Sequence, residues 1–146
     1  MPIPLKPFIM IRHGQTTANA EHKLSGHTDV KLSKQGKAEA TAAKDLLSEQ
    51  ENKPSIIIHS RLTRAKQTAE IINKALKLDI VEHPHIHEQN FGDWEEKGIG
   101  LYLESYNERA NPPNCETFDQ FDERIRSALN EILTEHDNPL IVCHGG

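Results

Sequence analysis

The chain has 146 residues, of which 36% are apolar and 5% aromatic, and a formal net charge of −5. This length suits one domain with an aliphatic core, and we interpret residues 1–146 as a single domain. The negative charge, without a Lys/Arg-rich run, argues against nucleic acid or an anionic membrane as a partner. The N-terminal segment lacks the apolar centre of a signal peptide, and two cysteines make no disulfide framework. The sequence therefore predicts a cytoplasmic protein.

Short apolar runs alternate with longer helical patterns along the chain. Strands are predicted at residues 8–11, 55–58, 79–83 and 140–143. This alternation predicts an α/β fold, a three-layer sandwich with a mostly parallel central sheet and helices on both faces. Ligands of such sheets bind beyond the carboxyl ends of the strands.

Three amphipathic helices are predicted between these strands. Ser33 is the expected N-cap of the first, and Thr117 with Gln120 forms a capping box at the start of the third. The residues of their apolar faces are, helix by helix, Ala38, Ala42, Leu46 and Leu47; Ala65, Thr68, Ala69, Ile72 and Leu76; and Phe118, Phe121, Ile125, Ala128 and Ile132.

Basic and histidine side chains follow three of the predicted strands. Arg12 and His13 come after the first strand, Arg64 lies shortly after the second, and His144 follows the last. Guanidinium groups match the geometry of phosphate oxygens. The sequence contains no P-loop, no dinucleotide fingerprint and no run of carboxylates suited to Mg²⁺. It therefore predicts a metal-free phosphate site whose positive charge comes from side chains.

Phosphoryl transfer at such a site needs a nucleophile and a general acid. A neutral imidazole can attack phosphorus if its second nitrogen is held as a donor. An acid must then protonate the leaving oxygen, and Glu88, in the loop after the third strand, is a candidate.

Five segments resemble, in order, the motifs of the histidine phosphatase superfamily, also called the phosphoglycerate mutase-like family. They are IRHGQTTAN, SGHTDVKLSKQG, HSRLTRAKQTAE, HEQNFGDWE and VCHGG. The resemblance implies a phosphoglycerate mutase-like fold, with His13 as the phosphate acceptor and Glu88 as the proton donor. It also implies that Arg12, Arg64 and His144 surround the phosphoryl oxygens, and it implies no cofactor or metal. The substrate contacts that it implies are Asn19, Ser25, Gly26 and Gly145.

By this resemblance the chain is expected to be a metal-independent phosphomonoester hydrolase that acts on a small phosphorylated metabolite through a phosphohistidine. A phosphoglycerate mutase and a non-catalytic phosphate-binding module are the alternatives. Mutases of the family carry a long basic segment after the acid, whereas residues 95–111 are short and as acidic as basic, which favours a phosphatase. The oligomeric state stays open, a homodimer included.

Three residues depart from the family pattern near the expected position of the organic part of the substrate. Arg61 stands where proline is common, and Glu96 and Cys115 stand where glycine is common. These departures bear on the substrate more than on the phosphate chemistry.

Two other interpretations of the histidines and cysteines were weighed. His83, His85 and His87 alternate as zinc ligands can, but Pro84 disfavours a regular strand there, and no further ligand is clearly spaced to complete a site. Cys143 precedes His144, yet neighbouring strand residues point to opposite faces, so Cys143 is predicted to be core.

The chain ends on LIVCHGG. Relatives continue past this motif with a helix and usually one more strand, and a domain ending here would leave His144 on a fraying terminus. We therefore expect that Gly146 is not the natural end and that the domain is incomplete at its C-terminus.

Overall fold

Four parallel strands form the central sheet of the computed structural model, which describes residues 2–106 and 111–146. They are β1 (Ile9–Arg12), β2 (Ile57–Ser60), β3 (Ile80–His83) and β4 (Leu140–Cys143). Their order across the sheet is β1-β4-β2-β3. The predicted strands are confirmed to within two residues at each end, and the last one is a central strand.

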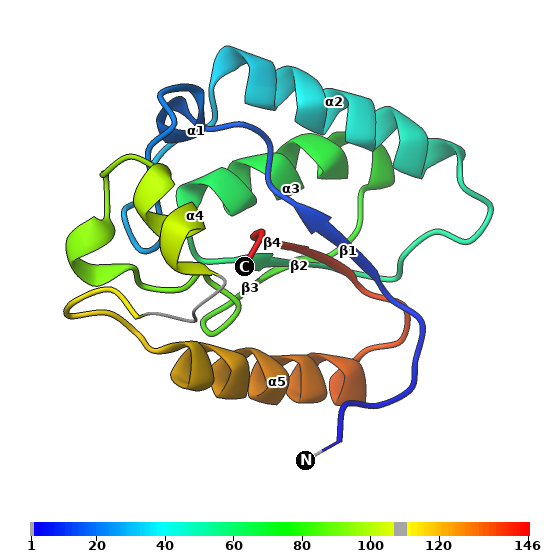
Figure 1. Ribbon diagram of the computed structural model, residues 1–146. Helices are drawn as coiled ribbons and strands as arrows, with labels where there is room; N and C mark the ends of the chain where they lie inside the picture. The colour runs from blue at the N-terminus through cyan, green and yellow to red at the C-terminus, as the bar shows by residue number, and fades with distance from the viewer. Residues whose placement is uncertain (1, 107–110) are drawn as a thin grey trace.

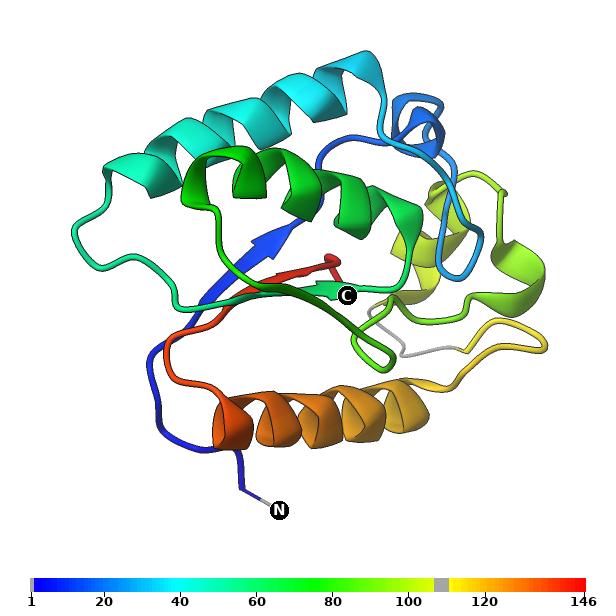
Figure 2. The same ribbon diagram turned by 180° about the vertical axis from the view of Figure 1, so that it is seen from behind.

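Helices cover both faces of this sheet. Figures 1 and 2 show α2 (Lys34–Glu49) and α3 (Thr63–Leu76) on one face and α5 (Phe118–Glu135) on the other. Two short helices, α1 (Thr17–Ala20) and α4 (Gly100–Tyr106), lie near the end to which the strands point, and a 3₁₀ turn η1 spans Gly92–Trp94. The predicted α/β three-layer sandwich with a parallel sheet is confirmed.

Strand β4 supplies side chains to two separate apolar cores. Leu140 and Val142 belong to the cluster under α2 and α3, whereas Ile141 and Cys143 belong to the cluster under α5. Successive strand residues point to opposite faces, so a strand covered on both faces must be apolar throughout. This explains the uninterrupted LIVC run.

The predicted ends and faces of α3 and α5 are largely confirmed. Thr117 and Gln120 form the expected capping box at α5. The buried residues of α3 include Ala65, Thr68, Ala69 and Ile72, and those of α5 include Ala128 and Ile132.

The predicted apolar face of α2 is wrong in its rotation. Ser33 caps the helix as expected, but Ala38, Ala42 and Leu46 are exposed, whereas Gly36 and Ala40 are buried with Leu47. A Cβ atom on Gly36 would lie 1.9 Å from the carbonyl oxygen of Gln15, so this contact requires glycine and fixes the rotation of the helix. Alanines occur on several sides of the helix, and the sequence therefore offered too little apolar contrast to find the buried face.

The segment 95–111, on which the choice of a phosphatase over a mutase depends, is described as far as Tyr106, and residues 107–110 lie outside the described residues. In the described part of the chain no helix combines the length and apolar character needed to cross a bilayer.

The buried face of α5 provides a test of the packing. Leu133 is 0% exposed and Leu46 is 68% exposed, so the same substitution should act very differently at the two positions. Leu133→Ala should lower the free energy of unfolding by about 3 kcal/mol, because it removes buried methyl groups and leaves a cavity. Leu46→Ala should change it by less than about 0.5 kcal/mol. Urea unfolding of both variants measures the difference, and equal losses would contradict this packing.

Candidate active site

His13 and His144 lie side by side at the carboxyl ends of two paired strands. Strand β1 pairs with β4 so that Arg12 stands opposite Cys143, and the His13 amide donates to the Cys143 carbonyl at 3.1 Å. The two imidazole centroids are 5.2 Å apart, with the rings edge to face. The structure thus brings together two histidines that are 131 residues apart in the sequence.

The His13 ring is held in one tautomer. Its Nδ1 lies 2.7 Å from the Gly14 carbonyl oxygen, and because a carbonyl only accepts, Nδ1 carries the proton. Burial lowers the pKa of His13 to about 4, and the charges of Arg64 and Arg12 add to this effect. The imidazole is therefore neutral near pH 7, and its Nε2 presents a free lone pair.

The His144 ring has the opposite arrangement. The buried hydroxyl of Ser60 accepts a bond from the Leu62 amide and lies 2.7 Å from Nε2 of His144. Because this hydroxyl oxygen already accepts from Leu62, we infer that Ser60 donates to Nε2, which places the proton of the neutral ring on Nδ1. Burial lowers the pKa of His144 to about 2, and Nδ1 is buried without a partner in the described structure. His144 thus offers one uncharged N–H donor beside His13.

Arg64 is the most deeply buried cation of the site, at 1% exposure. Its guanidinium donates to the carbonyl oxygens of Thr28 at 2.9 Å and Gly26 at 2.7 Å, and more weakly to that of Ser25 at 3.3 Å. These bonds hold the loop 25–28 beside the site and use only part of the five N–H donors of a guanidinium. Arg64 therefore both fixes this loop and retains donors for an anion.

Glu88 lies near enough to Arg64 and Arg12 to interact with their charges and is 8% exposed. Its carboxylate accepts from the Gln89 amide at 2.9 Å and the Gly146 amide at 3.1 Å. Burial raises the pKa of Glu88, and these two bonds and the charges of Arg64 and Arg12 only partly oppose it. A carboxyl with a raised pKa keeps its proton to higher pH, as a general acid must.

Two of the four expected substrate contacts face the same region. The Ser25 hydroxyl oxygen is buried without a partner in the described structure, and Gly145 packs against Arg12, whose Cζ would be 3.3 Å from an added Cβ. Gly26 lies so close to the Gln89 carbonyl that a side chain would not fit. Asn19 uses its side-chain oxygen in the cap of α1, where it accepts from the Thr16 amide.

Sequence analysis missed three residues that hold the site in place. Ser60 orients His144, while Thr68 accepts from the Gly14 amide at 3.1 Å and donates to the Arg64 carbonyl at 2.8 Å. Glu95 accepts from the Gly26 amide at 2.6 Å. All three lie inside segments that resemble family motifs, which is the signal that could have found them.

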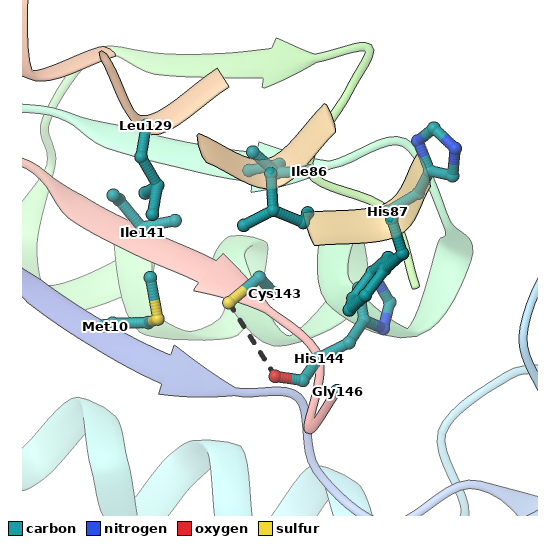
Figure 3. Close-up of a pocket in the computed structure, with 10 residues that line it drawn as sticks. Met10, Ile86, His87, Leu129, Ile141, Cys143, His144 and Gly146 are labelled. Carbon is teal, nitrogen blue, oxygen red and sulfur yellow. Dashed lines mark hydrogen bonds between the residues drawn. The ribbon is translucent and has the colours of Figure 1, made fainter. Parts of the chain in front are cut away.

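A small pocket opens beside His144 on the α5 side of the sheet. Figure 3 shows Met10, Ile141, Leu129 and Ile86 along its apolar walls, with His144 at one end. Burial raises the pKa of the neighbouring Cys143 thiol to about 11, so this cysteine is an inert part of the core, as predicted.

The alternating histidines do not converge on one point. The His83 and His85 rings lie edge to face with their centroids 6.0 Å apart. His87 instead lies edge to face with His27, at a centroid distance of 4.8 Å. No set of three or more His, Cys, Asp or Glu in the described part of the chain is arranged to hold a metal ion.

The profile of the histidine phosphatase superfamily (branch 1) matches residues 8–146. The chain belongs to this superfamily.

Individual relatives support a phosphatase-type enzyme. The chain is 36% identical to the uncharacterized phosphatase PhoE of Bacillus subtilis, over 93% of this chain and 70% of the relative. It is 34% identical to the probable phosphoglycerate mutase GpmB of Escherichia fergusonii, over 93% of this chain and 68% of the relative. The crystal structure of a putative alpha-ribazole-5'-P phosphatase from Escherichia coli superposes with a TM-score of 0.76 at 30% identity, over 92% of this chain and 71% of that one.

The bond between Ser60 and His144 predicts a measurable tautomer. The ¹⁵N chemical shifts of His144 at pH 7 should show a proton on Nδ1 in the native protein. In Ser60→Ala the hydroxyl that holds this tautomer is lost, and the population should move toward the Nε2–H form, which is intrinsically favoured in free imidazole side chains. A native His144 protonated at Nε2, or an unchanged Ser60→Ala spectrum, would contradict the assignment.

Proposed function

We propose that this protein is a metal-independent phosphomonoester hydrolase that acts through a phosphohistidine at His13. The observation that carries the proposal is the edge-to-face pair of imidazoles, with the buried His13 held by the Gly14 carbonyl and the half-buried His144 held by the Ser60 hydroxyl. One ring presents a lone pair and the other an N–H donor, next to two guanidinium groups and a carboxyl with a raised pKa. Nucleophile, charge stabilisation and acid are thereby supplied by the chain itself.

The proposed reaction has two steps. In the first, Nε2 of His13 attacks phosphorus, the bond from phosphorus to the ester oxygen breaks, and Glu88 gives its proton to the leaving alcohol. In the second, water attacks phosphorus, the Glu88 carboxylate takes a proton from that water, the bond from phosphorus to Nε2 of His13 breaks, and inorganic phosphate leaves. His13 and Glu88 return to their starting protonation states.

Charge on the transferring phosphoryl group is the main demand that this chemistry makes on the protein. Arg12 and Arg64 supply positive charge, and the Nδ1–H of His144 supplies a neutral hydrogen bond. A neutral donor is an advantage here because a third cation would further lower the basicity of His13.

We propose a small phosphorylated metabolite as the substrate and the cytoplasm as its location. One relative with a solved structure is described as a putative alpha-ribazole-5'-P phosphatase, and the substrate named there is a small phosphate ester. Ser25, with its unpartnered hydroxyl, and the loop 25–28 that Arg64 holds are suited to contact the alcohol part of such an ester.

A phosphoglycerate mutase is the second candidate, because one relative of 34% identity bears that description. The same His13 would then return the phosphoryl group to a second hydroxyl instead of to water. A requirement for 2,3-bisphosphoglycerate and isomerisation faster than hydrolysis would select this alternative.

The hydrolase proposal predicts turnover of p-nitrophenyl phosphate in excess chelator. His13→Ala should reduce turnover to the uncatalysed rate, because the neighbouring His144 presents an N–H donor and not a lone pair to the phosphoryl group. His22→Asn is the matched control: His22 is exposed and has a φ of 55°, which asparagine tolerates, so its turnover should equal that of the native protein. Equal turnover by His13→Ala would exclude His13 as the nucleophile.

The two shifted pKa values predict the pH dependence of kcat/KM. The activity requires neutral His13, so it should fall only below a pH of about 4, where the imidazole becomes protonated. It also requires protonated Glu88, so it should fall as the pH rises through the raised pKa of that carboxyl. Glu88→Gln cannot donate a proton and should lower kcat/KM about 100-fold at acid pH and flatten the alkaline limb. An unchanged alkaline limb in this variant would contradict the role of Glu88.

A further inference from the structure

Helix α5 holds the loop that carries Glu88 through the guanidinium of Arg124, in addition to the apolar packing of Ile86 against this helix. One terminal nitrogen of its guanidinium donates to the carbonyl oxygens of His85 at 2.8 Å and His87 at 2.9 Å. The other lies 3.3 Å from the carbonyl oxygen of Glu88 itself. A single rigid fork therefore contacts three carbonyls within four consecutive residues.

Glu116, which lies just before α5 in the chain, completes the connection. Its carboxylate accepts from Arg124 Nε at 2.7 Å and from a terminal nitrogen of Arg124 at 2.8 Å. Its backbone amide donates to the Asn90 carbonyl at 3.0 Å, and its carboxylate accepts from the Asn90 amide at 3.2 Å. Gln89 adds a bond from its side-chain amide to the Glu116 carbonyl at 2.8 Å.

The Arg124–Glu116 ion pair is largely shielded from solvent, which strengthens the interaction between its charges. The side chains of Arg124 and Glu116 are each 16% exposed, and the bidentate geometry is that of the stronger class of charge-assisted bonds. Burial acts to raise the pKa of Glu116, but the hydrogen bond and the charge of Arg124 outweigh it, and the net shift is downward. The lowered pKa keeps the carboxylate charged, and the pair intact, to lower pH than an ordinary glutamate would allow.

We propose that Arg124 and Glu116 are positioning residues that hold Glu88 where it can protonate the leaving oxygen. The hydrogen bonds of the two side chains within the described residues are to each other and to the backbone of residues 85–90, and none is to His13, His144, Arg12 or Arg64. The inference rests on the proposed function. A positioning role has a consequence that a purely stabilising ion pair lacks. The loss of kcat/KM on removing the pair should be larger for a substrate whose leaving group needs a proton.

The test compares two esters in Arg124→Lys. Lysine keeps a positive charge beside Glu116 but lacks the planar fork that reaches three carbonyls. p-Nitrophenolate is a weak base and can leave without a proton, whereas an alkoxide is a strong base and needs a proton from the acid in order to leave. We expect kcat/KM for an alkyl phosphate to fall about 10-fold more than kcat/KM for p-nitrophenyl phosphate. Equal losses for the two esters would overturn the proposal.

Arg126→Lys is the matched control on the same helix. Arg126 forms an exposed pair with Asp122 at 2.7 Å, so its variant should leave both kcat/KM values unchanged. Glu116→Gln keeps the shape of the side chain and is the second variant, to be used if Arg124→Lys does not fold. It should show the same dependence of the loss in kcat/KM on the leaving group.

Amide hydrogen exchange separates this proposal from the proposed function. The Gln89 and Asn90 amides should exchange faster in Arg124→Lys than in the native protein, and at the native rate in Arg126→Lys. If the native protein hydrolyses neither ester, the proposed function fails, and unchanged exchange in Arg124→Lys would independently refute the positioning of the loop. Faster exchange with an equal loss for both esters would show a stabilising pair only and would also overturn the proposal.

Discussion

The pairing of β1 with β4 is the constraint on which the rest of the site depends. It places Arg12 opposite Cys143, and the next residue of each strand is a histidine. Because the two strands are parallel, both end at the same edge of the sheet, and the two imidazoles meet there. A shift of one residue in this register would turn one of the histidines into an apolar core. The buried LIVC run, which fills both cores, therefore also fixes the geometry of the chemistry.

Burial has opposite consequences for the bases and the acid at this edge. It lowers the pKa of His13 to about 4 and raises that of Glu88, so the imidazole loses its proton and the carboxyl keeps one. One environment thus favours a neutral imidazole and a protonated carboxyl, the states that the proposed reaction requires of its nucleophile and its acid. The backbone carbonyl of Gly14 and the hydroxyl of Ser60 then decide which nitrogen of each ring carries the proton. Desolvation thus determines whether each group is charged, and the hydrogen bonds determine which nitrogen of each imidazole donates and which accepts.

Much of the fold and of the candidate site could be predicted from the sequence. Strand positions followed from apolar runs, and the basic and histidine residues after them followed from the rule that parallel strands present their carboxyl ends together. The rotation of α2 could not be predicted, because it is set by the contact of Gly36 with Gln15, which is steric and leaves no periodic signal. The Arg124–Glu116 pair could not be predicted either. The loop that it holds lies far from both residues in the sequence, so the pair resembles any surface ion pair until the chain is folded.

The central claim is that a phosphoryl group becomes attached to Nε2 of His13. The most direct measurement is rapid quenching of the native protein with a phosphate-labelled ester, followed by peptide mapping of the trapped label. The account predicts label on the peptide that contains His13, stable in base and lost in acid, as a phosphoramidate is. A label that is stable in acid and lost in base, or that lies on a peptide without His13, would contradict it.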